Sequence, residues 1–326
     1  MLGNILKAAI EMREAGEPAA LATLLSAQGF VPVESNGKLL VTAAGKLLGM
    51  AGNASLAAEV CTEVRRVLEA NQRSLPQFLV PSQDATSNGW YNQWTVEMLI
   101  EPLSEYSPEL LHALVDTEET GHRGMLVTVL SNHPQHPAGQ RKLLVGDDGT
   151  TVGCLNDATL EVFATRRGQE ALLGNHDAIE DYQMAEGDRL RLLFEPILPT
   201  PTLYVFGCGQ VTLPLVRAAT LVGFRVRVFD NDASFVNQTR LPEADAALVM
   251  AFDQVGEAFD FGPDDYVVLM TRGHQYDQQI LEQIYACQAR YLGMLGSKRR
   301  ITAMWQVLEA QGIDRRHLER IHAPSV

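Results

Sequence analysis

Short hydrophobic runs alternate with polar, glycine-bearing segments from residue 202 to the end of the chain. Five such runs occupy residues 203–206, 226–229, 247–250, 266–270 and 291–295. The run at 266–270 is uninterrupted and β-branched, as is typical of a strand covered on both faces of a sheet. Between them, apolar residues recur at helical spacing, for example over 211–221 and 280–285. The pattern predicts an α/β fold, with a Rossmann-like, doubly wound parallel sheet in this part of the chain.

The first of these runs leads into a glycine turn, Gly207-Cys208-Gly209-Gln210, and Asp230 ends the second run. This layout is typical of a dinucleotide-binding βαβ unit, although Thr212 stands where the pattern has a third small residue. Glycines let the backbone approach a phosphate, and the acid can accept a hydrogen bond from a ribose hydroxyl. The alternative is a tight packing turn that binds nothing. Cys208 lies at a helix start, which lowers a thiol pKa, or is present because it is small.

Two later runs also end in polar loops. Thr271-Arg272-Gly273-His274 precedes Asp277, and Gly296-Ser297-Lys298 opens the next helix. Ligands of such sheets bind at the carboxyl ends of strands, so we expect these loops to face one site. His274 would face a ligand or brace its loop with Asp277, and Arg272 would contact phosphate or pair with Asp277. Ser297 is a candidate N-cap, and a bound anion would explain Lys298 in the first helical turn, where cations oppose the helix dipole. Solvated basic side chains are the alternative.

The first 198 residues contain an internal repeat. Residues 20–26 resemble 126–131, with Thr23 over Thr128, and Leu39-Leu40-Val41 matches Leu143-Leu144-Val145. Glu101-Pro102 likewise matches Glu195-Pro196. The repeat predicts an α+β domain over 1–198 with two copies, about 1–103 and 107–198, packed as a pseudo-symmetric pair. Two prolines in residues 199–202 mark a connection to the Rossmann-like domain, 202–326.

Composition narrows the class of protein. The formal charge is −14, with 26 basic and 40 acidic side chains, which argues against a nucleic-acid partner. Residues 1–198 carry −12, whereas residues 290–326 carry +4 beside the candidate phosphate site. The four cysteines form no C-x-x-C pair, and no apolar run approaches the ~18 residues of a membrane span. We therefore expect a cytoplasmic protein with reduced thiols and no membrane partner.

Four segments together resemble one known family. They are GCGQV at 207–211, TRGHQYD at 271–277, YLGMLGSKRR at 291–300 and RIHAP at 320–324. The chain resembles the xanthine dehydrogenase accessory factors, the XdhC/CoxI family. The resemblance implies a maturation factor for molybdenum hydroxylases that binds the molybdenum–molybdopterin cofactor, protects it during sulfuration and passes it to the apo-enzyme.

The resemblance also implies partners and site residues. The expected partners are a cysteine desulfurase and the large subunit of the hydroxylase, and a homodimer is left open. Cys154 lies near the second copy's equivalent of the family's glycine-rich N-terminal motif, and it is the candidate thiol for a sulfur or molybdenum contact. No residue is assigned as catalytic. The candidate cofactor-binding residues are Gly207, Cys208, Gly209, Gln210, Asp230, Thr271, Arg272, Gly273, His274, Asp277, Gly296, Ser297 and Lys298.

Two alternative functions remain open from the sequence. No nucleophile–base pair is visible, so a cofactor chaperone, with the pterin as a mononucleotide or a dinucleotide, is favoured over an enzyme. An NAD-dependent oxidoreductase is the first alternative, in which Asp230 would favour NAD over NADP. A nucleotide-sensing regulatory protein is the second. The predictions that follow from the sequence are a Rossmann-like cofactor site and a duplicated N-terminal domain.

Overall fold

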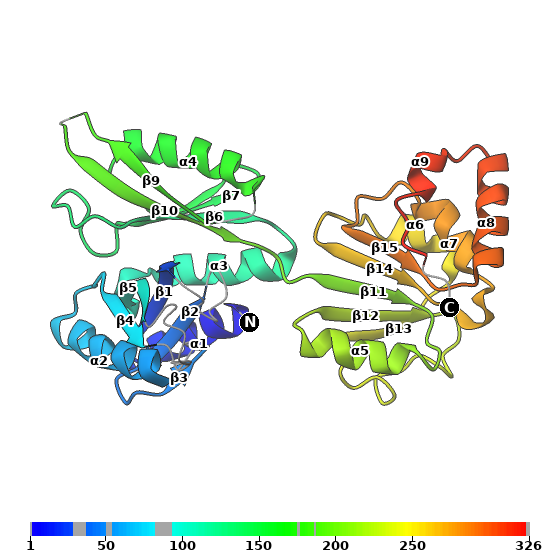
Figure 1. Cartoon of the computed structure of the whole chain (residues 1–326), viewed down its shortest axis with the longest axis horizontal. Helices are drawn as coiled ribbons and strands as arrows, with labels where there is room; N and C mark the ends of the chain where they lie inside the picture. The colour runs from blue at the N-terminus through cyan, green and yellow to red at the C-terminus, as the bar shows by residue number, and fades with distance from the viewer. Residues whose placement is uncertain are drawn as a thin grey trace, which may run out of the picture. The chain divides into compact units, whose positions relative to one another are not determined.

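The computed structural model describes residues 2–28, 37–49, 54–81, 93–174, 177–185 and 187–323. The chain divides into two compact units, Met1–Pro199 and Thr200–Val326. Figure 1 labels the elements of both. No helix in the described ranges combines the length and the hydrophobicity that a bilayer crossing requires.

The N-terminal unit contains two five-stranded antiparallel sheets with equivalent strand orders, β3-β2-β1-β5-β4 and β8-β7-β6-β10-β9. The equal orders confirm the internal duplication. The elements of the first copy are α1 (Leu2–Glu14), β1 (Ala19–Gln28), β2 (Lys38–Thr42), β3 (Leu47–Leu48), α2 (Ala54–Ala70), β4 (Gln77–Pro81) and β5 (Gln93–Pro102). Those of the second are α3 (Pro108–Thr120), β6 (Gly124–Val129), β7 (Lys142–Gly146), β8 (Thr151–Cys154), α4 (Ala158–Leu172), β9 (Ala178–Gln183) and β10 (Arg189–Ile197).

Each N-terminal sheet is covered by its own helix on one face and by a shared core on the other. The helix α2 packs on the first sheet through Val60 and Val64, and α4 packs on the second through Leu160. The opposite faces meet α1 and α3 in one cluster, which holds Leu21 of the first sheet and Leu126 of the second. In Figure 1, α3 accordingly lies between the two sheets. The two copies therefore bury each other's sheet faces, as the repeat predicts.

The same hairpin glycine recurs in both copies for a steric reason. Gly49 and Gly153 have φ values of 110° and 100°. A Cβ atom would lie 2.6 Å from the Lys38 carbonyl oxygen at Gly49, and 2.4 Å from the Lys142 carbonyl oxygen at Gly153. Only glycine combines this φ with so close an approach of the neighbouring strand.

Two buried lysines cross between the copies. Lys38 Nζ donates to Thr23 Oγ1 of its own copy at 2.8 Å and to Glu195 Oε1 of the other copy at 2.7 Å. Lys142 Nζ donates to Thr128 Oγ1 at 3.2 Å and to Glu101 Oε2 at 2.7 Å. The repeated glutamates were recognised in the sequence, but the lysines were missed. The signal was present, because a lysine precedes Leu-Leu-Val in both copies.

The C-terminal unit is a five-stranded parallel sheet in the order β13-β12-β11-β14-β15. This is the order of a Rossmann fold, with its switch point between β11 and β14. The strands are β11 (Thr202–Phe206), β12 (Arg225–Asp230), β13 (Ala246–Val249), β14 (Asp265–Leu269) and β15 (Tyr291–Met294). The helices are α5 (Thr212–Leu221), α6 (Val255–Ala258), α7 (Asp277–Ile284), α8 (Lys298–Ala310) and α9 (Arg315–Leu318).

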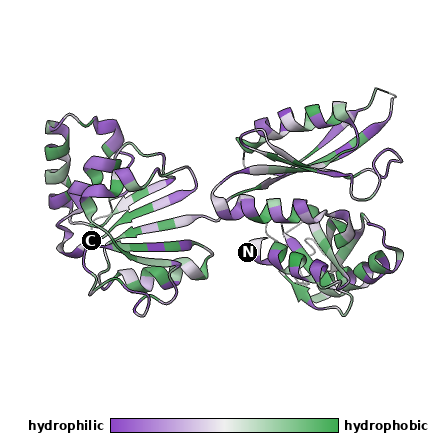
Figure 2. Ribbon diagram, turned by 180° about the vertical axis from the view of Figure 1, so that it is seen from behind, coloured by the Kyte–Doolittle hydropathy of each residue, from purple (hydrophilic) through white to green (hydrophobic). Residues whose placement is uncertain are grey.

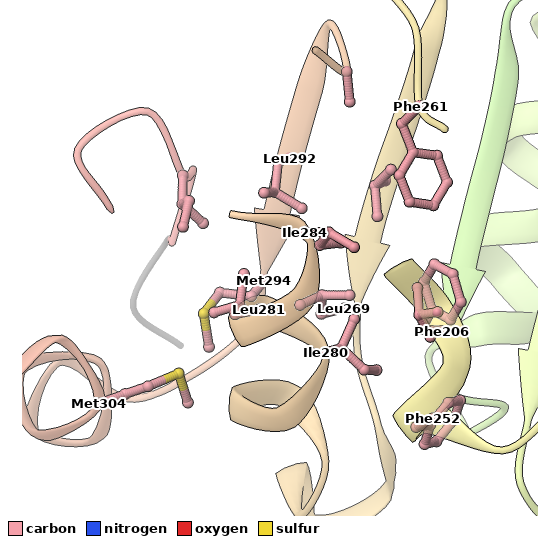
Figure 3. Close-up of a cluster of buried hydrophobic side chains, with 14 of the residues drawn as sticks. Phe206, Phe252, Phe261, Leu269, Ile280, Leu281, Ile284, Leu292, Met294 and Met304 are labelled. Atoms are coloured by element: carbon pink, nitrogen blue, oxygen red, sulfur yellow. The ribbon is translucent and has the colours of Figure 1, made fainter. Parts of the chain in front are cut away.

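Both faces of the central strands are covered, which explains the apolar residues of β11 and β14. Val205 and Val228 pack with Val216 of α5 in one cluster. Figure 3 shows the second cluster, in which Phe206 and Leu269 of neighbouring strands pack with Ile280 of α7. In Figure 2, hydrophobic residues run along these strands. The predicted doubly wound sheet is therefore confirmed, and its strand ends meet at one edge.

Candidate functional site

A cavity of about 530 Å³ opens at the carboxyl ends of β11, β14 and β15. Its volume lies within the ~300–1,000 Å³ typical of small-molecule sites. The structure brings three predicted loops together around it. Eight predicted residues line the cavity: Gly209, Gln210, Thr271, Arg272, Gly273, His274, Gly296 and Ser297. Arg300, for which the sequence leaves an anion contact and a solvated side chain equally open, also lines it.

The two glycines of the turn after β11 have different roles. Gly207 has a φ of 111°, and a Cβ atom there would lie 2.3 Å from the Met270 carbonyl oxygen. It is therefore required for packing of the turn against the loop after β14. At Gly209, a Cβ atom would meet no atom within 4 Å. Because Gly209 lines the cavity, the missing side chain leaves room for a ligand to approach the backbone.

The helix α5 begins at this cavity without a side-chain cap. Val211 at its N-cap position makes no side-chain cap hydrogen bond. Thr212 turns its hydroxyl back into the turn, where Oγ1 donates to the Gly207 carbonyl oxygen at 2.8 Å and accepts from the Gly209 N–H at 3.1 Å. Thr212 thus rigidifies the turn in place of a third small residue. The uncapped amides of the first helical turn can receive an anion.

Cys208 has a structural role. It is completely buried, and its Sγ donates to the Phe235 carbonyl oxygen at 3.1 Å. Burial raises the pKa of the Cys208 thiol above its ordinary value. The helix start therefore does not lower this pKa, and the thiol stays protonated at neutral pH. Small size in a tight turn explains the residue.

Asp230 lies beneath the turn and does not line the cavity. Its side chain is 1% exposed, and its Oδ2 accepts from the Cys208 N–H at 2.7 Å. Its Oδ1 accepts from the Asp232 N–H at 3.1 Å and from Arg272 Nη2 at 3.2 Å. Arg272 therefore pairs with Asp230 rather than with Asp277, and its guanidinium carbon lies 3.9 Å from the Phe235 ring centroid.

The loop after β14 is braced by Asp277 at the start of α7. Asp277 Oδ1 accepts from the Thr271 hydroxyl at 2.5 Å and from the Thr271 N–H at 3.1 Å. Its Oδ2 lies 3.0 Å from His274 Nδ1 and 3.4 Å from Arg300 Nη2. Burial raises the pKa of the Asp277 carboxyl above its ordinary value, although the Thr271 hydrogen bonds oppose this. Asp277 thus holds the loop while His274 lines the cavity.

The backbone of this loop is also unusual. Gly273 and His274 have consecutive left-handed φ values of 59° and 58°. A left-handed conformation is strained for histidine, and such strain persists only where the surroundings enforce it. Here Asp277 contacts the imidazole, and Arg300 Nη2 donates to the His274 carbonyl oxygen. The position of His274 at the cavity is therefore held from both sides.

The start of α8 forms the third wall of the cavity. Ser297 stands at the N-cap position with extended φ and ψ of −68° and 148°, but its side chain makes no cap hydrogen bond. The guanidinium of Arg300 is 29% exposed, and burial lowers its pKa below the ordinary value. Lys298 lies with Arg299 and Thr302 along an adjacent open groove rather than in the cavity. An uncapped helix start and one arginine thus face the same space.

Cys154 lies in the other unit, at the end of β8. Its Sγ is half-buried and accepts from the Asn156 N–H at 3.1 Å. No group of three potential metal-binding side chains occurs among the residues that the structure describes. A metal or sulfur contact at Cys154 stays a prediction.

Two family models match separate parts of the chain. The model described as the XdhC Rossmann domain matches residues 203–325, and that of the XdhC and CoxI family matches residues 12–78. Together they span more than half of the chain, and the Rossmann-domain match contains all four predicted motifs. The chain belongs to the XdhC/CoxI family. The resemblance predicted from the sequence is thereby confirmed.

Two curated relatives extend the comparison. The chain is 25% identical over 202 residues to an uncharacterized protein, YqeB, of Escherichia coli, a match that spans 59% of this chain and 36% of that protein. It is 32% identical over 109 residues to a Bacillus subtilis protein described as a probable subunit of xanthine dehydrogenase, spanning 33% of each. The chain thus spans about a third of the length of these relatives.

A crystal structure shares the fold. A xanthine dehydrogenase from Bacillus halodurans superposes with a TM-score of 0.73 at 22% identity, covering 93% of this chain and 84% of that one. At this identity the superposition supports the architecture alone. The family membership therefore rests on the sequence models, and the site rests on the geometry described above.

Proposed function

We propose that this protein binds the molybdenum–pterin cofactor at the strand-end cavity and holds it during maturation of a xanthine dehydrogenase-type hydroxylase. The cavity carries this proposal, because it joins an open glycine position, two uncapped helix starts and Arg300 in one space. Family membership supports the choice of cofactor, and the name of the Bacillus subtilis relative supports the choice of client. The proposed partners are a cysteine desulfurase and the large subunit of the hydroxylase.

The residues around the cavity fit a phosphate-bearing ligand. A phosphate needs donors and room for close contact, and Gly209 leaves that room at the backbone. The guanidinium of Arg300 supplies a charged donor at the opposite wall, where its Asp277 contact is long, at 3.4 Å. The molybdenum centre, when bound, supplies the redox chemistry of the client enzyme. The chain's own residues bind the phosphate, orient the ligand and shield it from water.

The site favours binding over catalysis. The thiol of Cys208 is buried and protonated, and the carboxylates of Asp230 and Asp277 are occupied by backbone and side-chain donors. None of these three groups presents a free nucleophile or base to the cavity, and His274, which lines the cavity, is held at Nδ1 by Asp277. This arrangement supports a carrier that protects a reactive group and then releases it.

A graded pair of variants tests the proposal. Gly209→Ala and Gly209→Val place one and three carbon atoms where a ligand would approach the turn, and neither side chain begins in a clash. We expect Gly209→Val to weaken binding of the molybdenum–pterin cofactor by about 10- to 100-fold, with a smaller effect of Gly209→Ala. Fluorescence quenching and thermal melting on the same samples separate lost binding from lost folding.

The controls are a non-cavity glycine and a second ligand. Gly262→Ala, where the nearest atom to an added Cβ is 3.8 Å away, should leave binding unchanged. Incubation with NADH in the absence of the molybdenum cofactor should show no hydride transfer. Unchanged cofactor binding by Gly209→Val would show that the cofactor does not bind against this turn. Failure of the wild-type protein to bind the cofactor would contradict the proposal.

A further inference from the structure

The acid that usually recognises a nucleoside is not available in this Rossmann unit. In dinucleotide-binding units, the carboxylate after the second strand accepts from ribose hydroxyls. Here both oxygens of Asp230 already accept hydrogen bonds, from Cys208 and Asp232 N–H groups and from Arg272. Because the Asp230 side chain is 1% exposed and Arg272 is bonded to it, a ribose could reach this carboxylate only if Arg272 left it.

Arg272 also spans the strand ends. It belongs to the loop after β14, yet its Nη2 lies 3.3 Å from Asn231 Oδ1 and 3.5 Å from Asp232 Oδ2, both in the loop after β12. Since β11 lies between β12 and β14 in the sheet, the side chain reaches past the end of β11. Its guanidinium stacks on Phe235, which follows β12. The stacking and the hydrogen bonds therefore hold the Arg272 side chain next to Asp230.

The cavity lies on the other side of this arginine. Its lining residues follow β11, β14 and β15, and none belongs to the segment after β12. In an open Rossmann site a dinucleotide spans the switch point and reaches both sides. In this protein Arg272 and Phe235 lie together on the side next to β12, whereas the cavity opens on the side next to β15 and α8.

We propose that Arg272 closes the nucleoside half of the Rossmann site, so that the cavity takes a phosphate-bearing group with no nucleoside on the β12 side. This inference rests on the proposed function for the identity of the ligand, which would then be the pterin cofactor with its phosphate and without an attached nucleotide. Arg272 is the specificity-determining residue. It excludes NAD and dinucleotide forms of the cofactor because it is hydrogen-bonded to Asp230 and covers the Phe235 ring, the two groups that a nucleoside would contact.

Titration calorimetry with pyrophosphate and ADP-ribose tests the closure directly, because the two ligands differ by the nucleoside and a sugar. Wild-type protein should bind ADP-ribose no more tightly than pyrophosphate. In Arg272→Ala, the freed Asp230 carboxylate and Phe235 ring should tighten ADP-ribose binding at least about tenfold, without tightening pyrophosphate binding. A merely structural role for Arg272 would not produce a gain that is confined to the nucleoside ligand.

Arg240→Ala is the matched control. Arg240 Nη1 also contacts the Phe235 carbonyl oxygen, at 3.2 Å, and its guanidinium lies 5.5 Å from the same ring. It makes no contact with Asp230, so its removal should leave the ratio of the two affinities unchanged. Circular dichroism checks that each variant is folded.

The outcomes separate this inference from the proposed function. Wild-type protein that binds ADP-ribose at least about tenfold more tightly than pyrophosphate would overturn the closure, even if Arg272→Ala does not fold. A folded Arg272→Ala variant without the gain would overturn it as well. Absence of molybdenum–pterin binding in wild-type protein would overturn the proposed function. The titrations with pyrophosphate and ADP-ribose would still decide whether Arg272 closes the nucleoside half of the site.

Discussion

The two units of the chain use buried charges differently. In the N-terminal unit, both partners of each crossed pair are buried: Lys38 and Glu195 are each 4% exposed, and Lys142 and Glu101 are 2% and 1% exposed. At the strand ends of the C-terminal unit only the acids are buried, while Arg272 is 33% and Arg300 29% exposed. In the N-terminal pairs both charges are closed off from solvent, whereas in the C-terminal pairs the arginine stays accessible at the cavity. The contrast separates structural charges from site charges.

The crossed pairs also differ from each other, and breaking the less supported one should have the largest effect. Lys38 is the one side chain in the described ranges that hydrogen-bonds Glu195, whereas Glu101 keeps the Tyr106 hydroxyl at 3.1 Å and Arg73 Nη1 at 3.9 Å. Lys38→Met should therefore destabilise the protein by about 3–5 kcal/mol in urea unfolding, because it leaves a buried carboxylate without a partner.

Two further lysine variants serve as comparisons for the stability loss of Lys38→Met. Lys142→Met should cost less than Lys38→Met, because Glu101 retains its other partners. Lys7→Met removes a pair with Glu119 in which Lys7 is 51% exposed, and should change stability by no more than about 1 kcal/mol. Equal losses for Lys38 and Lys142 would show that the additional contacts of Glu101 do not support it.

The two glycines of the turn after β11 give the next largest difference. Gly207→Ala should cost about 2–4 kcal/mol, because the added Cβ meets the Met270 carbonyl and the φ of 111° is strained for alanine. Gly209→Ala should leave the unfolding midpoint almost unchanged. Thermal and chemical unfolding of both variants measures this, and similar stabilities would contradict the division of the turn into a packing glycine and a ligand-facing glycine.

The two classes of buried acid should respond to pH in opposite directions. Burial alone would raise the pKa of Glu101, but the nearby charges of Lys142 and Arg73 hold it below the ordinary value of 4.5. Its contribution to stability is therefore present above pH 4.5 and is lost as the pH falls through the lowered pKa. For Asp277 the pKa is raised by burial, so its contribution is greatest below the ordinary value of 3.8 and is lost as the pH rises through the raised pKa.

Unfolding of Glu101→Gln and Asp277→Asn across pH 3 to 7, each compared with wild type, measures these signs. The advantage of wild type over Glu101→Gln should shrink as the pH falls, and its advantage over Asp277→Asn should shrink as the pH rises. A pKa displaced by one pH unit corresponds to a change of about 1.4 kcal/mol in the free energy of unfolding. If the two stability differences changed with pH in the same direction, the pKa values of Glu101 and Asp277 would be shifted in the same direction, which would contradict this prediction.

The smallest expected difference in stability is between the two serines at helix N-cap positions, Ser107 and Ser297. Ser107 caps α3 by accepting from the Leu110 N–H at 3.1 Å, so Ser107→Ala should cost about 1 kcal/mol. Ser297→Ala should cost less than about 0.5 kcal/mol, because its hydroxyl caps nothing. A full capping loss at Ser297 in thermal unfolding would mean that the start of α8 is closed by its own side chain rather than left open at the cavity.

Features set by local pattern could be predicted from the sequence. The strands β11 and β14 are apolar because both faces of the sheet are covered there, and the turn after β11 required Gly207. The duplication was visible because repeated positions keep the same residue types. Pairings between distant loops were not predictable. Nothing in the order of residues shows that Lys38 meets Glu195 of the other copy, or that Arg272 reaches Asp230 instead of Asp277.

The crossing of the two lysines has a consequence for the history of the N-terminal unit. One copy alone holds a lysine and a glutamate that are not hydrogen-bonded to each other, so a half-length chain would lack the direct partner of both charges. Two such chains satisfy every charge when they associate about a twofold axis. Gene fusion of a homodimer would produce this arrangement directly, and the later loss of equivalence between the halves would explain why Glu101 has gained neighbours that Glu195 lacks.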